Sequence, residues 1–319
     1  MDVVPTFQPP RFWRNPHLQT IWPLLCRPRR GPTLTRQRLE LNDGDFIDLD
    51  WLTRPQPNAP LLLLIHGLEG NADSHYIRRM LLLAQQQALA VVVMHQRSCS
   101  GEPNRLLRSY HSGASDDLGL VVAAINQQYP HNPLWAAGYS LGGNQLAKYL
   151  GEQGRHSGIE RAAVVSPPLD LAACAERMKA GFSRVYQRRL LKQMQQKTVQ
   201  KLAMFPEFQL AQPVAQLNTF YRFDDAITAP TNGFVDAPDY YRRASGKAYV
   251  AQIQTPTLLL HALDDPFMTT AVVPEHHSEA VTLELHPLGG HVGFIAGGWP
   301  WAPQFYLEPR LLRFFQQQQ

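Results

Sequence analysis

A serine flanked by glycines is the first candidate for chemistry in this chain. Residues 138–143 read GYSLGG, and they lie between an apolar run and a helix-like stretch. A serine on a sharp strand-to-helix turn needs neighbours without side chains, so that the chain can fold back and the hydroxyl can project above a sheet. The pattern therefore predicts that Ser140 is a nucleophile, and not merely the residue that begins a helix.

Ser140 needs a histidine base with a carboxylate behind it, because a serine hydroxyl is a weak nucleophile near neutral pH. After a turn of this kind, the acid and then the histidine come later in the chain. Asp264 and Asp265 follow the apolar run TPTLLLHA, and His291 follows VTLELHPLGG. Among the twelve histidines, His291 is the expected base because two glycines before it help to present its ring. Both aspartates are candidates for the acid.

Two backbone amides are expected to stabilise the oxyanion that forms when such a serine attacks a carbonyl group. One belongs to the residue after the nucleophile, which is Leu141, and the other comes from the loop after an early strand. The stretch LIHGLEG provides that loop, and its glycines allow the amide of Leu68 to turn inward. The predicted oxyanion hole is therefore the pair of N–H groups of Leu68 and Leu141.

The elements that must position these groups alternate between strands and helices. A β-hairpin is predicted at 38–52, around the turn NDGD. Apolar runs predict buried strands at 61–67, 88–98, 134–138, 162–166, 255–262 and, as the last strand, 281–287. Helix-like stretches lie at 74–88, 116–129, 142–153 and 305–315. Buried strands separated by helices indicate an α/β fold with a mostly parallel central sheet covered by helices on both faces.

We expect a single domain over residues 1–319 with two additions to the sheet. Residues 1–35 are rich in proline and aromatic side chains, and we expect an irregular leader in which HLQTIWP packs onto the core. About ninety residues separate the strand that ends at Ser166 from the next apolar run. This gap predicts an inserted, partly helical segment at 170–250. We expect it to form a lid with an acyl pocket beneath it.

Composition excludes several classes of protein. The chain is 44% hydrophobic and 18% charged, as in globular proteins, and its longest apolar runs fall far short of the roughly 20 residues of a membrane span. The N-terminus carries prolines and early charges where a secretory signal would be apolar. We therefore expect a cytoplasmic protein without a transmembrane segment.

Charge and cysteines limit the expected partners further. The three cysteines are widely spaced, so they predict neither a disulfide framework nor a zinc site, and no metal or cofactor is expected. A net charge of +4 is too small to indicate nucleic-acid binding, although it leaves room for weak peripheral contact with a membrane. Basic runs at 27–38 and 184–201 are interpreted as solvated faces. The expected ligand is a small-molecule ester.

Nearly the whole chain resembles the α/β-hydrolase superfamily. More closely, it is similar to the YheT-like hydrolases, which are related to the mammalian ABHD1/2/3 group and to yeast medium-chain acyl ester synthase/esterases. The stretches that carry the resemblance are HLQTIWP, LNDGDFIDLDW, HGLEG, MHQRSCSGEPNR, YHSGASDDL, GYSLGGN, FSRVYQRRLLK, FDDAITAP, GFVDAPDYYRRAS, HALDDPFM and GGHVGF.

This resemblance implies the α/β-hydrolase fold and a relay of Ser140, Asp265 and His291 that hydrolyses carboxylic esters with short- to medium-chain or lipid-like acyl groups. It favours Asp265 over Asp264, because Pro266 follows Asp265 and fixes the turn that leaves the strand. The eukaryotic members carry an N-terminal membrane anchor, which we do not expect here.

Other activities would use the same parts. Acyl transfer and thioester hydrolysis need the same three side chains, and a non-catalytic ligand-binding protein could retain the fold. His111 and Asp116 match an H-x4-D pattern that the resemblance associates with acyltransferase activity in some relatives. Alternatively, Asp116 caps the helix that begins there and His111 orders a loop. A dehalogenase or epoxide hydrolase is excluded, because it would place an aspartate at position 140.

Overall fold

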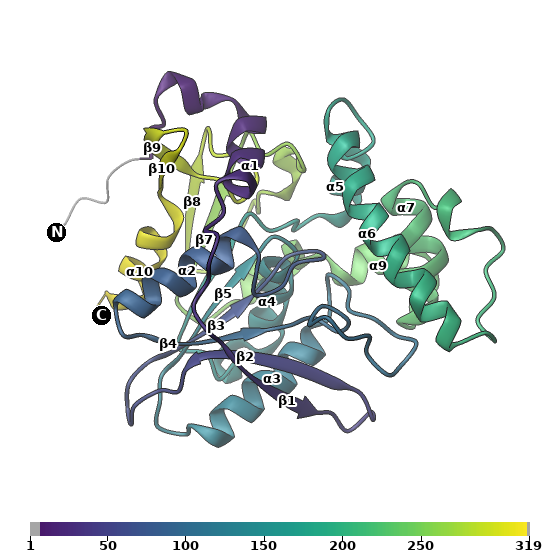
Figure 1. The fold of residues 1–319 in the computed structure, drawn as a ribbon, viewed down its shortest axis with the longest axis horizontal. Helices are drawn as coiled ribbons and strands as arrows, with labels where there is room; N and C mark the ends of the chain where they lie inside the picture. The colour runs from purple at the N-terminus through teal and green to yellow at the C-terminus, as the bar shows by residue number, and fades with distance from the viewer. Residues whose placement is uncertain (1–6, 318–319) are drawn as a thin grey trace.

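The computed structural model describes residues 7–317, and an eight-stranded sheet forms its centre (Figure 1). The strands are β1 Thr35–Glu40, β2 Phe46–Thr53, β3 Leu61–Ile65, β4 Ala90–Met94, β5 Leu134–Tyr139, β6 Arg161–Val165, β7 Thr257–Ala262 and β8 Val281–His286. Their order across the sheet is β1-β2-β4-β3-β5-β6-β7-β8. Strand β2 is antiparallel to both of its neighbours, β1 and β4. The six strands β3 to β8 are all parallel to one another.

Helices cover both faces of this sheet, as buried parallel strands require. Helices α2 (His75–Gln86) and α10 (Leu307–Gln316) pack in one hydrophobic cluster, and α3 (Ser115–Gln128) and α4 (Leu141–Gln153) pack in another. The expected fold class, a mostly parallel sheet between two helical layers, is therefore confirmed.

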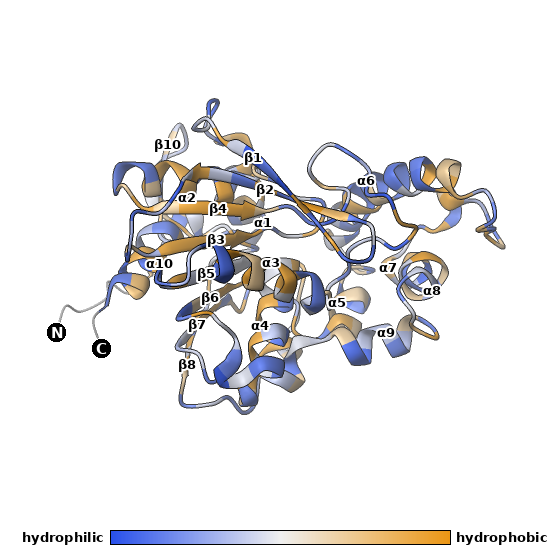
Figure 2. Cartoon of the chain, turned by 90° about the horizontal axis from the view of Figure 1, so that it is seen from below, coloured by the Kyte–Doolittle hydropathy of each residue, from blue (hydrophilic) through white to orange (hydrophobic). Residues whose placement is uncertain are grey.

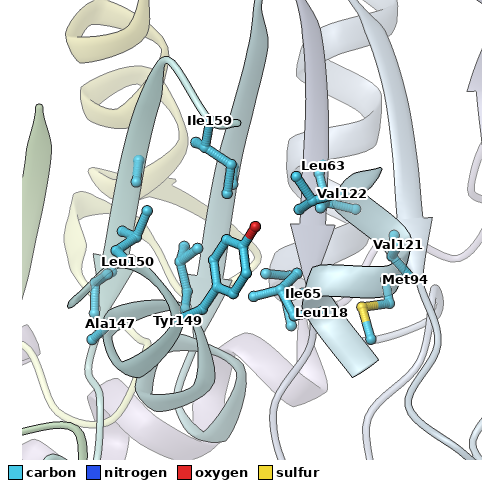
Figure 3. Packing of buried hydrophobic residues seen from close by; sticks show 14 of the residues in the cluster. Leu63, Ile65, Met94, Leu118, Val121, Val122, Ala147, Tyr149, Leu150 and Ile159 are labelled. Carbon is cyan, nitrogen blue, oxygen red and sulfur yellow. The ribbon is translucent and has the colours of Figure 1, made fainter. Parts of the chain in front are cut away.

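Strand β3 shows how one apolar run supplies both layers. All five of its residues are buried, and successive side chains of a strand point to opposite faces. Leu62 and Leu64 therefore join the cluster of α2 and α10. Leu63 and Ile65 join the cluster of α3 and α4, which Figure 3 shows from close by. The hydrophobic colouring of the central strands in Figure 2 reflects this double burial.

The chain between β6 and β7 leaves the sheet and forms a helical segment, which we call the cap (residues 170–250). Its helices are α5 Leu171–Arg177, α6 Ser183–Met204, α7 Phe220–Phe223, α8 Ala229–Thr231 and α9 Ala237–Ala244. Figures 1 and 2 show them beyond the carboxyl ends of the parallel strands. The cap therefore lies at the sheet edge where the loops after β3, β5, β7 and β8 meet.

The expectation of an irregular leader at 1–35 is wrong for much of its length. Residues 1–6 lie outside the described part, but Arg11–Arg14 form a 3₁₀ turn and Pro16–Leu25 form helix α1. The side chain of Asn15 caps α1 by accepting hydrogen bonds from the N–H groups of His17 and Leu18. Pro16 occupies the first helical position, where its missing N–H costs nothing. The density of prolines concealed this start signal.

A second correction concerns the end of the chain. The run at 281–287 was expected to be the last strand, but β9 (Ile295–Trp299) and β10 (Ala302–Phe305) follow it as an antiparallel pair. The pair contains Pro303 and two glycines, which weaken a strand pattern in sequence. Its position is fixed by α1, because the indole N–H of Trp22 donates to the carbonyl oxygen of Pro300.

Candidate active site

Ser140 lies on the sharp turn between β5 and α4, as GYSLGG predicts. Its φ of +52° is in the left-handed region, which residues with a side chain seldom adopt. A Cβ on Gly138 would collide with the carbonyl oxygen of Gly142. A Cβ on Gly142 would lie 2.5 Å from the carbonyl oxygen of His66. The glycines therefore permit the backbone contacts that hold the serine in this strained conformation.

His291 lies in the loop after β8, and its ring reaches the serine. Its Nε2 is 2.9 Å from Oγ of Ser140. The ring stacks on Phe267 with centroids 4.0 Å apart and planes inclined by only 9°. The backbone N–H of His291 donates to Oγ1 of Thr20 in α1. The stacked phenyl ring and the threonine therefore fix the plane and position of the imidazole.

The two adjacent aspartates make different contacts. Oδ2 of Asp265 is 2.7 Å from Nδ1 of His291, and Asp265 is buried. Oδ1 of Asp264 instead accepts a hydrogen bond from the N–H of Gly290, and burial raises the pKa of Asp264. The structure thus brings Asp265, His291 and Ser140 into one line of hydrogen bonds, whereas Asp264 holds the loop that leads to the histidine.

The predicted oxyanion donors both belong to residues that line the cavity around Ser140. Leu141 is the first residue of α4, where N–H groups have no acceptor within the helix. Leu68 follows β3 on a loop that runs against the serine, since a Cβ on Gly67 would lie 3.1 Å from the Cβ of Ser140. The structure therefore places both residues beside Ser140.

Hydrogen bonds on either side hold the loop that contains Leu68. The N–H of Gly67 donates to the hydroxyl oxygen of Tyr76 at 2.9 Å. The N–H of Glu69 donates to the hydroxyl oxygen of Tyr110 at 2.8 Å, and Glu69 has a positive φ of 55°. The peptide group between these two anchored amides has little freedom to rotate.

Two lysines of α6 connect the cap to core loops, which the sequence analysis missed: Lys197 contacts the loop of Leu68, and Lys201 contacts the loop after β4. Nζ of Lys197 is 2.8 Å from one carboxylate oxygen of Glu69, and the other oxygen accepts from the hydroxyl of Tyr110 at 2.7 Å. One helical turn later, Lys201 donates to the backbone and side-chain oxygens of Asn104. The interpretation of 184–201 as a solvated face is therefore wrong at these two positions. Their spacing of four residues was the available signal.

The leader also supplies residues that sequence reasoning missed. The side-chain amide of Gln19 is fully buried, donating to the carbonyl oxygen of Ile295 and accepting from its N–H. With Thr20 bound to the N–H of His291, α1 holds the histidine itself and the C-terminal end of its loop, where β9 begins. Two polar residues inside the apolar stretch HLQTIWP were the only hint of this contact.

A cavity of about 780 Å³ opens in front of Ser140, between α1 and the cap. The cap contributes mainly apolar side chains to its wall, among them Met178, Phe182, Val185, Met194, Phe220 and Phe223. Such a wall suits an acyl chain, because apolar surface removed from water is stabilising. Asp224 also lines the cavity, and burial raises its pKa to about 7.

The side chains of His111 and Asp116 are hydrogen-bonded neither to each other nor to Ser140. Nδ1 of His111 accepts from the N–H of Gly113, and burial lowers the pKa of His111 to about 4. Asp116 lies in the first turn of α3 and pairs with Arg108 at 2.9 Å. Ala114, and not Asp116, occupies the capping position of that helix. These contacts order the loop before α3.

Two further observations concern metals and membranes. Among residues 7–317, no group of three or more His, Cys, Asp or Glu side chains is arranged to hold a metal ion. Over the same residues, no helix combines the length and the apolar character that crossing a bilayer would need.

Comparison with known proteins defines the class to which this fold and site belong. Residues 60–297 match the model of the alpha/beta hydrolase fold family. The chain therefore belongs to the alpha/beta hydrolase family. The solved esterase Pf2001 of Pyrococcus furiosus shares the fold with a TM-score of 0.57 at 15% identity, over 97% of this chain and 98% of that chain.

Relatives place the chain within the family. It is 45% identical over 312 residues to "Putative esterase YheT" of Escherichia coli (strain K12), covering 96% of this chain and 91% of that protein. It is 30% identical over 305 residues to "Phospholipase ABHD3" of Mus musculus, covering 88% and 74%. It is 29% identical over 270 residues to "Monoacylglycerol lipase" of Saccharomyces cerevisiae, covering 80% and 59%. The expected resemblance to esterase-like members is therefore confirmed.

Proposed function

We propose that this protein is a serine hydrolase that cleaves carboxylic esters through an acyl-enzyme on Ser140. The observation that carries the proposal is the line of hydrogen bonds from Ser140 through His291 to Asp265, at the base of a largely apolar cavity. Relatives named esterase, phospholipase and monoacylglycerol lipase support the same class of reaction.

Formation of the acyl-enzyme begins with attack of the Ser140 oxygen on the ester carbonyl carbon. Nε2 of His291 accepts the hydroxyl proton, and Asp265 at Nδ1 stabilises the imidazolium and maintains the required tautomer. The N–H groups of Leu68 and Leu141 donate to the oxyanion of the tetrahedral intermediate. The intermediate collapses when the carbon–oxygen bond to the alcohol breaks, and the imidazolium returns its proton to that alcohol.

Hydrolysis of the acyl-enzyme repeats these steps with water. His291 removes a proton from a water molecule whose oxygen attacks the acyl carbon, and the same two amides stabilise the second oxyanion. Cleavage of the bond to Ser140 releases the carboxylic acid and restores the serine hydroxyl. No further group is needed to balance the reaction.

The cap determines which acyl groups reach the serine in this proposal. Its apolar wall would receive a short- to medium-chain or lipid-like acyl group, and residues 170–250 would act as a lid on the single domain. Because α6 is tied to the core near Leu68, substrate fit and oxyanion binding are expected to depend on each other.

The test combines covalent labelling with product analysis on purified protein. A fluorophosphonate probe should label the wild-type chain and leave Ser140→Ala unlabelled, because only an activated serine reacts. A panel of p-nitrophenyl esters from acetate to palmitate, with the acid product quantified, should show turnover by the wild type only. A folded wild-type protein that neither reacts with the probe nor hydrolyses any ester would overturn the proposal. Transfer of the acyl group to an added alcohol in place of water would identify an acyltransferase.

We also propose a cytoplasmic enzyme that acts on a small-molecule ester and does not bind nucleic acid. All three cysteines are free thiols, two of them buried, and free thiols are usual in reducing compartments. Cell fractionation with an epitope-tagged chain tests the location, and recovery in a secreted or periplasmic fraction would contradict it.

A further inference from the structure

The tip of the β9–β10 hairpin exposes two tryptophans. Trp299 is 68% exposed and Trp301 is 78% exposed, and their rings stack in parallel with centroids 5.5 Å apart. Pro300 between them is held by the indole of Trp22 and by Sγ of Cys26, both in contact with its carbonyl oxygen. The tryptophans are therefore presented by a fixed support, and a large apolar surface of this kind usually marks an interaction site.

The apolar surface continues along α1 to the mouth of the cavity. Leu25, at the end of α1, is 69% exposed, and its neighbour Leu24 is exposed and also lines the cavity. Across the mouth, Phe182, which directly precedes α6, and Val185 of α6 are likewise exposed and line the same cavity. The ring centroids of His17 in α1 and Phe182 are 4.6 Å apart. Helix α1 therefore connects the hairpin side of the apolar surface with the cap side.

We name this surface the tryptophan face. It consists of Leu24, Leu25, Phe182, Val185, Trp299 and Trp301. Figure 1 shows α1 between the β9–β10 hairpin on one side and the first part of the cap on the other.

The two chain segments that carry most of the tryptophan face are basic. Residues 11–30 contain five arginines and no acidic residue, and residues 182–192 contain three arginines, one lysine and no acidic residue. The whole chain has 30 basic and 26 acidic residues, so acidic residues outnumber basic ones elsewhere. Arg27 and Arg189 belong to these two segments, and both are exposed at the mouth of the cavity. The excess of positive charge is therefore carried by these two segments, which both contribute to the mouth of the cavity.

We propose that the tryptophan face docks on an anionic phospholipid surface. Tryptophans are favoured at the boundary between lipid headgroups and acyl chains, exposed leucines gain by entering it, and arginines bind lipid phosphates. A protein partner or a second copy on this face would cover the mouth between Leu24 and Val185. A bilayer would instead offer lipid-like esters directly to that mouth. This delivery rests on the proposed function, whereas the docking itself does not.

The test measures vesicle binding by the Ser140→Ala chain, so that no lipid is consumed. We expect it to float with vesicles of equal parts phosphatidylcholine and phosphatidylglycerol, with a blue shift of tryptophan fluorescence, and to dissociate as salt rises. Adding Trp299→Ala with Trp301→Ala, or Arg27→Glu with Arg30→Glu, should lower the bound fraction by about tenfold. The matched controls are Leu120→Ala with Val235→Ala and Arg155→Glu with Arg313→Glu, which change exposed residues that do not belong to the face or to its two basic segments.

Equal binding by the face variants and their controls, equal binding to pure phosphatidylcholine, or no binding at all would overturn the proposal. So would lipid-free dimers that the tryptophan substitutions disperse, because the face would then be occupied by a second copy. In active protein, the same tryptophan substitutions should lower turnover of a vesicle-embedded ester relative to turnover of soluble p-nitrophenyl butyrate. Turnover of the soluble ester by the wild-type chain tests the proposed function separately, and its absence would leave the docking result intact.

Discussion

The turn of Ser140 and helix α6 border the same cavity, but they are held in place in different ways. At the turn, backbone packs on backbone so closely that a Cβ on Gly142 would lie 2.5 Å from a carbonyl oxygen. Helix α6 instead reaches the core through the ends of long side chains, such as Lys197 on Glu69 and Lys201 on Asn104. We therefore expect the backbone around Ser140 to tolerate little rearrangement, and the side-chain contacts of α6 to rearrange more easily.

This difference in packing suits two different roles, catalysis at the turn of Ser140 and substrate selection by the cap. Reacting groups must stay within fractions of an ångström of their productive positions, which close backbone packing achieves. The cap has small hydrophobic clusters of its own, one of them around Leu191, Leu217 and Phe223, and we expect these to preserve its structure when its polar contacts to the core change. We therefore expect substitutions near the turn to reduce catalysis severely and substitutions in the cap to change it by degrees.

The largest contrast is expected between the adjacent carboxylates. Asp265→Asn should lower kcat by about 10³- to 10⁴-fold, because an amide no longer enforces the tautomer of His291. Asp264→Asn should lower kcat by less than about tenfold, since the amide oxygen can still accept from the N–H of Gly290. Steady-state kinetics on both folded variants measures the ratio. The reverse ranking would assign the acid to Asp264.

Breaking the ion pair between Lys197 and Glu69 should have an intermediate effect on kcat. Lys197→Met leaves the buried carboxylate of Glu69 without its cation, so the loop that carries Leu68 should lose its fixed position. We expect kcat on a short soluble ester to fall by about tenfold with a smaller change in KM, because the oxyanion is stabilised only in the transition state. This result would make Lys197 a positioning residue, which acts through Glu69 and the loop of Leu68.

Two further variants separate positioning from a general effect on α6. Lys197→Arg keeps the charge and should recover most of kcat. Lys192→Met removes an exposed lysine from the same helix and should leave kcat within about twofold of wild type. Equal kcat for Lys197→Met and Lys192→Met would show that the ion pair does not reach the oxyanion hole.

The comparison also explains which features could be predicted from sequence. Buried strands need continuous apolar runs and the turn of Ser140 needs glycines. The order of strands and helices along the chain and the position of Ser140 could therefore be inferred locally. The preference for Asp265 needed the family resemblance together with Pro266, since the two adjacent side chains are chemically identical. In the structure the distinction is geometric, because only Asp265 contacts the ring of His291.

Contacts between distant segments could not be predicted. Gln19 and Thr20 hold the loop of His291 from more than 270 positions away, as their hydrogen bonds to Ile295 and His291 show. A polar residue in a short apolar helix is usually a solvated residue, and only the fold reveals that Gln19 is fully buried. The same applies to Lys197, whose partner lies on another element.

A smaller effect is expected where the cap lines the cavity. Met194→Ala should widen the cavity that this side chain lines. The ratio of kcat/KM for long-chain over short-chain p-nitrophenyl esters should then rise by about two- to fivefold. The control is Met204→Ala, which removes an exposed methionine at the end of the same helix. A uniform loss on all esters would instead indicate that this side chain positions catalytic groups.

Substitution of Asp224 should have the smallest effect on kcat. It tests whether the cap has a stability of its own. Its carboxylate oxygens accept from the hydroxyls of Thr228 and Tyr241 inside the cap. Burial raises its pKa to about 7, above the value of about 4 expected in an unfolded chain. The unfolded state therefore releases the proton first as pH rises. The carboxyl imposes no penalty below about pH 4, and the folded cap loses stability between about pH 4 and pH 7.

Asp224→Asn mimics the protonated carboxyl at every pH, so the variant should be more stable than wild type at pH 8 and nearly equal to it at pH 4.5. The gain should amount to a few kcal/mol at most, measured by thermal unfolding together with the rate of proteolysis within the cap. Buried histidines change the free energy of unfolding in the opposite direction. Burial lowers the pKa of His66 to about 3, so this group makes the fold more stable as pH rises. The informative quantity is therefore the difference between variant and wild type, with exposed Glu207→Gln as control. A difference that does not change with pH would mean that Asp224 is already ionised in the folded cap.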